Sequence, residues 1–426
     1  MINVGINRGH NSSVVILKNG DIVFYIENER LSRIKYDGFP FSALFKIKDF
    51  TDYIDNFCIA GTSKLPPNNE RGIPYDIYTN IVLHLTKSFN TRGHIGHDLG
   101  LYHHKMHASC AFYNSGFKEA ICIVSDGFGS DLLDDDDNIY GKETTSVFSC
   151  KYPARFEIIE KHVCSLLPRV KWDQASTEKI KIDDTLSPAG AFSITANSFG
   201  FHPLDGGKIM GMSTYGKEDL SLPPIYKDGK INKELFIKTD ALNLDYKLFE
   251  FQDKANFAFA LQKETQKNMK KYIHDIIDKT KCKNICLSGG FFLNCVANYE
   301  YLDGLPEDVN LYIDPISHDG GTSIGAAKFI WHSETGDTTI RKQNTIYYGT
   351  EPDYQDLFLK IRDVDNESIT EVDYKDVISL IIEGNPVALY QGRSEAGPRA
   401  LGNRSILYDP RDKDGKDVVN TIKKRE

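Results

Sequence analysis

Residues 284–331 have the sequence NICLSGGFFLNCVANYEYLDGLPEDVNLYIDPISHDGGTSIGAAKFIW. Two short apolar segments, Asn284–Leu287 and Asn310–Ile313, are predicted strands, and a glycine-containing turn follows each of them. Apolar helices are predicted after the turns, over Phe291–Tyr301 and Gly321–Trp331. Strands that alternate with helices indicate an α/β fold, in which ligands bind at the carboxyl ends of strands, where these glycines fall.

The rest of the chain extends this pattern in both directions. An antiparallel meander is predicted at the amino terminus, from Ile2–Ile6, Ser13–Leu17 and Ile22–Glu27. Further predicted elements are helix Leu101–Tyr113, strand Glu119–Val124, hairpin strands Thr144–Cys150 and Phe156–His162, and helices Ser187–Phe199 and Phe257–Lys279. The polar stretch Ser333–Gln343 is the predicted domain boundary, because a new run of strands and helices follows it.

Composition narrows the class of protein. The 426 residues suffice for about three compact units, and 40% hydrophobic with 26% charged residues is typical of a folded globular protein. A net charge of −9 provides no field for holding nucleic acid. We expect a soluble cytoplasmic protein, because no leader and no apolar run of the roughly 18 residues of a membrane span is evident. Eight cysteines without a C-x-x-C pair indicate reduced, mostly buried thiols.

Histidines cluster in the predicted helix 101–113. His103 and His107 are four residues apart, so both imidazoles project from one helix face. Asp126 and Asp319 each fall where a strand ends, and such ends converge on one cleft. Two imidazoles with two carboxylates suit iron(II), zinc or manganese. For any single histidine, a packed or surface role is the alternative.

Three glycine-containing turns are candidate nucleotide sites: Asp126–Gly129, Ser288–Gly290 and Asp319–Ser323. Glycines let backbone amides approach phosphates, and the helices predicted after the last two turns offer positive dipole ends. None of the three matches a P-loop or a dinucleotide fingerprint, and ordinary turn chemistry is the alternative for each.

Basic residues gather near the carboxyl end, in a protein of negative net charge. They are Arg393, Arg399, Arg404, Lys423, Lys424 and Arg425. The cluster is either a phosphate clamp or a solvated loop. The charged run Glu27–Lys35 indicates surface salt bridges. The acidic run Asp131–Asp137 indicates a solvated loop tip. His10 is a candidate proton-transfer residue or a turn histidine.

Motifs along the whole chain together resemble the O-carbamoyltransferases of the nodulation-protein and antibiotic-tailoring type. The motifs are Val4-Gly5-Ile6, Gly9-His10-Asn11-Ser12-Ser13, Glu27 to Arg33, His103-His104-Lys105-Met106-His107-Ala108, Gly207-Lys208-Ile209-Met210-Gly211, Leu287-Ser288-Gly289-Gly290 with Asn294, and Gly397 to Ser405.

The resemblance implies a fold and a two-stage reaction. Residues 1–340 would form a duplicated actin-like ATPase domain, similar to the tRNA threonylcarbamoyl-transfer enzyme, and residues 341–426 a partial α/β carbamoyl-adenylate-forming (YrdC-like) domain. Carbamoyl phosphate and ATP would give carbamoyl-adenylate, whose carbamoyl group then passes to a hydroxyl of a small-molecule acceptor. Neither nucleic acid nor membrane is an expected partner, and a homodimer is one option for the oligomeric state.

The resemblance also implies roles for individual residues. The metal ligands, with iron(II) as the ion, would be His103, His107, Asp126 and Asp319. The nucleotide contacts would be Gly127, Ser288, Gly289, Gly290, Asn294 and Gly320. Carbamoyl phosphate and ATP handling would fall to Arg399, Arg404, Lys423 and Arg425. Catalytic contacts to acceptor or carbonyl would be made by His10 and Lys35.

Departures from the family pattern keep alternatives open. The family's second domain normally continues beyond Glu426, so we expect a truncated carboxyl-terminal domain. Gly206 stands where the family usually has an acid, and His318 would add an imidazole beside the metal. An actin-like metabolite kinase and a non-catalytic nucleotide-binding protein are the alternatives. Acceptor choice would lie in loops such as Leu65–Tyr75 and Arg169–Asp184, which no motif decodes.

Overall fold

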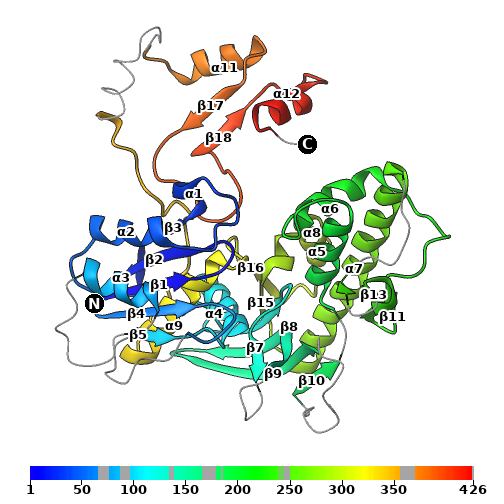
Figure 1. Ribbon diagram of the computed structural model, residues 1–426, viewed down its shortest axis with the longest axis horizontal. Coiled ribbons are helices and arrows are strands. Elements are labelled where there is room, and N and C mark those ends of the chain that lie inside the picture. Colours follow the sequence, from blue (N-terminus) through cyan, green and yellow to red (C-terminus); the bar gives the residue numbers. More distant parts are fainter. Residues whose placement is uncertain are drawn as a thin grey trace. The chain divides into compact units, whose positions relative to one another are not determined.

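The computed structural model describes residues 1–65, 76–86, 96–133, 139–165, 179–183, 186–238, 241–242, 250–355 and 370–424. The chain forms two compact units (Figure 1). The first contains Met1–Val23 and Glu27–Asn344, and the second contains Phe24–Ile26 and Thr345–Glu426. The assignment of residues 1–340 and 341–426 to two functional domains stays a prediction.

The first unit begins with a five-stranded sheet in the order β3-β2-β1-β4-β5. Its strands are β1 (Ile2–Asn7), β2 (Ser13–Lys18), β3 (Asp21–Glu27), β4 (Asn56–Ala60) and β5 (Gly96–Asp98). Strand β1 pairs antiparallel with β2 and parallel with β4, and β4 pairs parallel with β5. Asn19 and Gly20 both have positive φ angles, as a tight hairpin turn requires, and the predicted opening meander is confirmed.

The second sheet repeats this arrangement. It has the order β10-β9-β8-β6-β15-β16, and β7 pairs with β8. Its strands are β6 (Glu119–Ser125), β7 (Asp131–Leu133), β8 (Ile139–Lys151), β9 (Arg155–Cys164), β10 (Ile180–Asp183), β15 (Asn284–Ser288) and β16 (Asn310–Ile313). Strand β6 pairs antiparallel with β8 and parallel with β15, which pairs parallel with β16. The order β9-β8-β6-β15-β16 repeats that of β3-β2-β1-β4-β5, with β10 added at the edge, and this confirms the predicted duplicated, actin-like α/β fold.

Helices flank both sheets. They are α1 (Glu29–Ser32), α2 (Phe41–Phe45), α3 (Ile77–Leu85), α4 (His103–Ser115), α5 (Pro188–Ser198), α6 (Gly206–Met212), α7 (Phe251–Thr280), α8 (Cys295–Leu302) and α9 (Gly320–Thr335). The short hairpins β11 (Tyr226–Lys227) with β12 (Lys230–Ile231) and β13 (Ile237–Lys238) with β14 (Ala241–Leu242) lie between α6 and α7 in the chain. Among the described residues, no helix has the length and hydrophobicity that a membrane crossing requires.

Two helices connect the sheets of the first unit. Helix α4 packs its alanine and aromatic side chains on β6, β8 and β15, while α9 packs on β1, β2 and β4. The two helices also pack on each other (Figure 1), and Gly325 of α9 comes close to the backbone of α4 at Met106. Residues at the amino-terminal ends of α4 and α9 therefore have fixed positions relative to both sheets.

The second unit contains α11 (Tyr374–Ile382), the antiparallel strands β17 (Val387–Tyr390) and β18 (Arg404–Leu407), and α12 (Gly415–Ile422). Glu395 organises the loop between the two strands, because its Oε1 accepts the amides of Leu401, Asn403 and Arg404 at 2.8–3.1 Å. This loop contains most of the motif Gly397 to Ser405.

Two local predictions require correction. Phe291–Tyr301 is not one helix, because a 3₁₀ turn over Gly290–Leu293 ends at Asn294, which caps α8 through its side chain. The run Glu27–Lys35 is not simply a surface salt-bridge segment, since Glu27 is buried. The prediction for the cysteines is confirmed: all eight are free thiols, and most are buried.

Candidate metal centre

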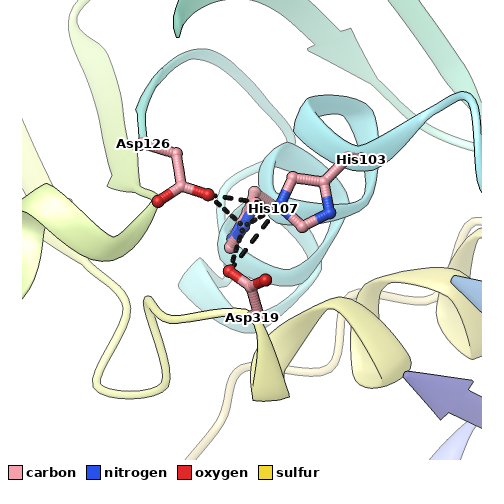
Figure 2. A group of neighbouring side chains, drawn as sticks. All are labelled: His103, His107, Asp126 and Asp319. Carbon is pink, nitrogen blue, oxygen red and sulfur yellow. Dashed lines mark hydrogen bonds and ion pairs between the residues drawn. The ribbon is translucent and has the colours of Figure 1, made fainter. Parts of the chain in front are cut away.

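The two histidines of the predicted chelating pair lie in the first two turns of α4 (Figure 2). Their Nε2 atoms are 3.1 Å apart, and both side chains are fully buried. Spacing of four residues places both rings on the same helix face. The adjacent His104 points elsewhere, with its Nδ1 2.8 Å from Ser146 Oγ.

Two carboxylates complete the group from other elements. Asp126 follows β6, and its Oδ2 lies 3.2 Å from His103 Nε2 and 3.6 Å from His107 Nε2. Asp319 precedes α9, and its Oδ1 lies 3.6 Å from each of the same two nitrogens (Figure 2). One donor atom from each of the four buried residues lies within 4.8 Å of all the others.

The donor set fits a divalent metal ion. Ligand atoms 2.0–2.2 Å from a tetrahedral ion are about 3.4 Å apart. The two imidazole nitrogens are 3.1 Å apart, and they lie 3.2–3.6 Å from the carboxylate oxygens. Imidazole nitrogen and carboxylate oxygen without thiolate suit zinc, manganese or iron. His103, His107, Asp126 and Asp319 are therefore the residues that could hold a metal.

The electrostatics of the group keep its acids ionised. Burial alone raises the pKa of Asp126, and the charge of Asp319 adds to this, but His103 and His107 hold that pKa far below its ordinary value. Asp319 behaves in the same way, with His10 and His103 opposing the effect of burial on its pKa. Burial lowers the pKa of His103, yet Asp319 and Asp126 outweigh burial and raise it to about 10. Two buried negative charges thus face the imidazoles, and a cation is the natural partner of such a pair.

The three glycine-containing turns meet at this group. Asp126 Oδ1 accepts the amides of Gly127 at 2.8 Å and Gly290 at 3.3 Å, which joins the first two turns. The amide of Gly289 donates to Ser317 O at 3.0 Å, close to the third turn. Gly289 has a φ of +99°, and a Cβ there would lie 2.3 Å from Ser125 O, so this turn requires glycine.

Two more histidines flank Asp319, and they have different surroundings. His10 is partly exposed, and its Nε2 lies 3.3 Å from Asp319 Oδ2, the oxygen that faces away from the histidine pair. His318 does not add an imidazole to the group, which corrects that expectation. Its Nδ1 accepts the amide of Gly320 at 3.1 Å, and its Nε2 lies 3.3 Å from Glu27 Oε1.

The other predicted residues of the first unit have structural partners. Lys35 is exposed and its Nζ lies 2.5 Å from Asp205 Oδ1. Asn294 exchanges hydrogen bonds with Gln262 at 2.9 and 3.1 Å while it caps α8. Ser288 ends β15, and Gly320 begins α9. The structure brings Gly127 and Gly290 to the metal group through Asp126.

The predicted basic residues of the second unit differ in their roles. Arg404 is half-buried, and its guanidinium donates to the carbonyls of Gln391 and Asn403 at 2.7 Å while it lies 3.7 Å over the Tyr390 ring. Arg399 is exposed in the loop, and Lys423 follows α12. Arg425 lies outside the described residues.

The sequence did not reveal the charged residues that contact the segments carrying the metal group. Glu143 on β8 is buried and forms an ion pair with Lys161 on β9. Asp205, which binds Lys35, also escaped notice. A signal for Glu143 existed, because it is an acid directly before the inward-facing, alternating segment Thr144–Cys150.

Two family models match the chain. The model of the carbamoyltransferase amino terminus matches residues 47–328, and the model of the carbamoyltransferase carboxyl terminus matches residues 378–426. The chain belongs to the carbamoyltransferase family. All four residues of the metal group fall in the amino-terminal match.

Relatives of this chain include the nodulation protein NolNO of Sinorhizobium fredii, 26% identical over 98% of this chain and 61% of that protein. An uncharacterized protein of Methanocaldococcus jannaschii is 28% identical over 77% of this chain and 54% of its own length. The 3'-hydroxymethylcephem-O-carbamoyltransferase of Streptomyces clavuligerus is 34% identical over 33% of this chain and 26% of that protein. The chain thus matches about half to three fifths of the first two of these proteins.

Solved structures give a weaker likeness. HypF of T. kodakarensis has a TM-score of 0.45 at 13% identity, over 79% of this chain and 48% of that chain. The ROK hexokinase of Thermus thermophilus has a TM-score of 0.37 at 11% identity, over 77% of this chain and 98% of that chain. TM-scores below 0.5 support no conclusion of their own.

Proposed function

We propose that this chain catalyses ATP-dependent O-carbamoyl transfer to a hydroxyl of a small molecule. Carbamoyl phosphate, ATP and water would give carbamoyl-adenylate, pyrophosphate and phosphate. The acceptor oxygen would then attack the carbamoyl carbon, with loss of its proton and departure of AMP. The observation that supports this most is the convergence of two histidines and two aspartates inside the carbamoyltransferase amino-terminal match.

His103, His107, Asp126 and Asp319 would hold the metal ion, with iron(II) as the proposed ion because two imidazoles with carboxylate are typical iron ligands. When bound, the ion would supply Lewis-acid charge neutralisation beside the phosphate of the mixed anhydride. The residues around the ion would bind the substrates and transfer the proton of the acceptor.

His10 is the proposed general base for the acceptor hydroxyl. Its side chain is 43% exposed, so an acceptor can reach it, and its Nε2 faces Asp319 Oδ2 at 3.3 Å. An imidazolium formed by taking the hydroxyl proton would be stabilised by that carboxylate. Because the other oxygen of Asp319 faces the histidine pair, one side chain orients both the base and the metal group.

The glycine-containing turns are the proposed nucleotide site. Gly127, Ser288, Gly289, Gly290, Asn294 and Gly320 remain the proposed contacts. The buried hydroxyls of Ser125 and Ser288, at the ends of β6 and β15, have no hydrogen-bond partner among the described residues. Two such hydroxyls at neighbouring strand ends suit a polar ligand such as a phosphate.

In the second unit, Arg399 and Lys423 are the proposed contacts to carbamoyl phosphate and ATP, together with Arg425. Arg399 is exposed, and so free to meet a ligand. Arg404 would act by shaping the loop, since its donors bind backbone carbonyls.

The acceptor class rests on the similarity to the 3'-hydroxymethylcephem-O-carbamoyltransferase, whose acceptor is a hydroxymethyl group of a cephem. A sugar, nucleoside or other natural product with a hydroxyl is therefore proposed. The predicted acceptor loops are Leu65–Tyr75 and Arg169–Asp184, and of these only Leu65 and residues 179–183, which include β10, lie within the described residues. The kinase alternative lacks support, because the family shown is that of carbamoyltransferases.

Carbamoyl-phosphate-dependent exchange of pyrophosphate into ATP tests the proposal. The 426-residue chain is assayed anaerobically with iron(II), next to the variant Arg399→Ala. We expect exchange in the parent chain and its loss in the variant. Absence of exchange in a parent chain that binds ATP and metal would contradict adenylate formation by this chain.

A further inference from the structure

A buried ion pair contacts the first turn of α4 and the loop after Asp126, outside the four residues of the metal group. Glu143 of β8 is 2% exposed, and its Oε1 pairs with Nζ of Lys161, whose side chain is 13% exposed. A charge pair removed from water is stable only when further hydrogen bonds satisfy its remaining atoms. The hydrogen-bond partners of the second oxygen of Glu143 therefore show which segments the ion pair connects.

Oε2 of Glu143 binds two backbone amides, and they belong to two different segments of the metal group. The amide of Ser130 donates at 3.2 Å, and Ser130 lies four residues after Asp126. The amide of His104 donates at 3.5 Å, from the first turn of α4. One carboxylate oxygen thus joins the loop after Asp126 to the helix that bears both histidine ligands.

The backbone reinforces this junction. The Glu143 carbonyl accepts the amide of Gly129 at 2.8 Å, and the Glu143 amide donates to Ser130 O at 3.2 Å. Ser130 Oγ accepts the amide of His103 at 2.9 Å and donates to Gly100 O at 3.2 Å. The first amides of a helix have no partner inside it, so Ser130 and Glu143 satisfy two of the four in α4.

The contacts between Glu143, Ser130 and the first turn of α4 are tightly packed at Gly129. A Cβ on Gly129 would lie 2.6 Å from the His104 ring and 2.9 Å from Glu143 Oε2. Burial alone raises the pKa of Glu143, but His104 and Lys161 outweigh it and lower the pKa to about 2. The carboxylate is therefore charged, and negative charge is favourable at a helix amino terminus.

We propose that Glu143, held by Lys161, is a positioning residue that sets the spacing between the histidine pair and Asp126. The inference rests on the metal centre of the proposed function. It assigns to Glu143 no contact with metal or substrate: the residue acts through the amides of His104 and Ser130 and through the hydroxyl that binds His103.

Cobalt(II) titration of the full chain tests this assignment. Absorbance titration gives the Kd for cobalt(II), and the d–d bands report the geometry of the bound ion. Glu143→Gln keeps the shape of the side chain but removes its charge and one acceptor atom. We expect the Kd to rise about 10- to 100-fold, as for other residues that orient metal ligands, and the d–d bands to change.

Ser146→Ala is the matched control. It removes the hydroxyl 2.8 Å from His104 Nδ1 but none of the groups that bind Glu143 at the backbone amides of His104 and Ser130 or at Lys161. We expect it to keep the parent Kd and spectrum. An equal loss in Ser146→Ala would overturn the assignment, since any loosening of α4 would then suffice.

Two further outcomes separate the proposals. If the parent chain binds no cobalt(II), the metal centre itself fails. If the parent binds and Glu143→Gln has the same Kd and bands, the positioning role fails alone. Should Glu143→Gln not fold, Ser130→Ala removes the acceptor of the His103 amide and keeps the ion pair. An unchanged Kd in Ser130→Ala would then refute the inference.

Discussion

Replacement of Gly325 by alanine should separate the two helices on which the metal group depends. Gly325 lies where α9 crosses α4, and a Cβ there would lie 1.9 Å from Met106 O and 2.9 Å from Cys110 N. Ordinary contact begins at 3.4 Å, so the helices must move apart by about 1.5 Å, the difference between 3.4 and 1.9 Å. Both obstructing atoms are backbone, so no side-chain rotation relieves the clash.

This movement reaches the metal group because three of its four residues lie on α4 or directly before α9. Met106 is the neighbour of His107, and Asp319 directly precedes α9. Metal–ligand distances tolerate only about 0.2 Å, far less than the expected displacement. We expect Gly325→Ala to lower the free energy of unfolding by about 1–3 kcal/mol. Metal affinity should fall at least about tenfold.

Urea unfolding of the metal-free chain and cobalt(II) titration measure the two effects. Gly211→Ala is the control, because Gly211 in α6 has no atom within 4 Å of a new Cβ. That control should keep the parent Kd and be neutral or slightly stabilising, since alanine favours helix. Parent-like stability and Kd in Gly325→Ala would refute the role of the close crossing.

Three more variants test separate parts of the account. Burial raises the pKa of Asp205, but bonds from Lys35 and Tyr36 lower it to about 2, so the native state binds fewer protons than the unfolded state between about pH 2 and 4. Asp205→Asn should therefore cost about 1 kcal/mol above pH 4, allowing for screening at the exposed Lys35, and the cost should vanish as the pH falls below about 2. Urea unfolding that shows a pH-independent difference would contradict this. His10→Gln should keep metal affinity and pyrophosphate exchange but slow acceptor carbamoylation by roughly 10²- to 10⁴-fold, and unchanged product formation would exclude the base role. Arg404→Lys should destabilise the β17–β18 hairpin by about 1–3 kcal/mol, because lysine cannot bind several carbonyls with a planar fork; hydrogen exchange at the parent rate would oppose this.

The sequence predicted the convergence of His103, His107, Asp126 and Asp319 because the signals for it are local. Spacing of four residues places His103 and His107 on one helix face, and Asp126 and Asp319 each follow a predicted strand. These short-range patterns predict which side chains can lie close together in the fold. Individual strands followed in the same way from apolar segments and turn residues, whereas the duplicated fold was implied only by the resemblance to the O-carbamoyltransferases.

Long-range pairing could not be predicted from such patterns. Glu143 and Lys161 lie on neighbouring strands, and their pairing depends on the register of β8 with β9, which includes irregular steps. Lys35 and Asp205 are 170 residues apart in the chain. The orientation of His318 toward Glu27 depends on the tertiary position of β3. Each of these contacts depends on a partner that is distant in the chain, and the pattern of a single sequence does not identify that partner.

The stoichiometry of iron(II) binding tests the central claim most directly. Anaerobic equilibrium dialysis of the full chain is compared with that of Asp126→Asn and His107→Ala. We predict one tightly bound ion per parent chain and a large loss of affinity in both variants, because each removes one of four converging donors. A parent chain without bound iron(II), or variants that bind it as the parent does, would contradict a metal centre at these residues.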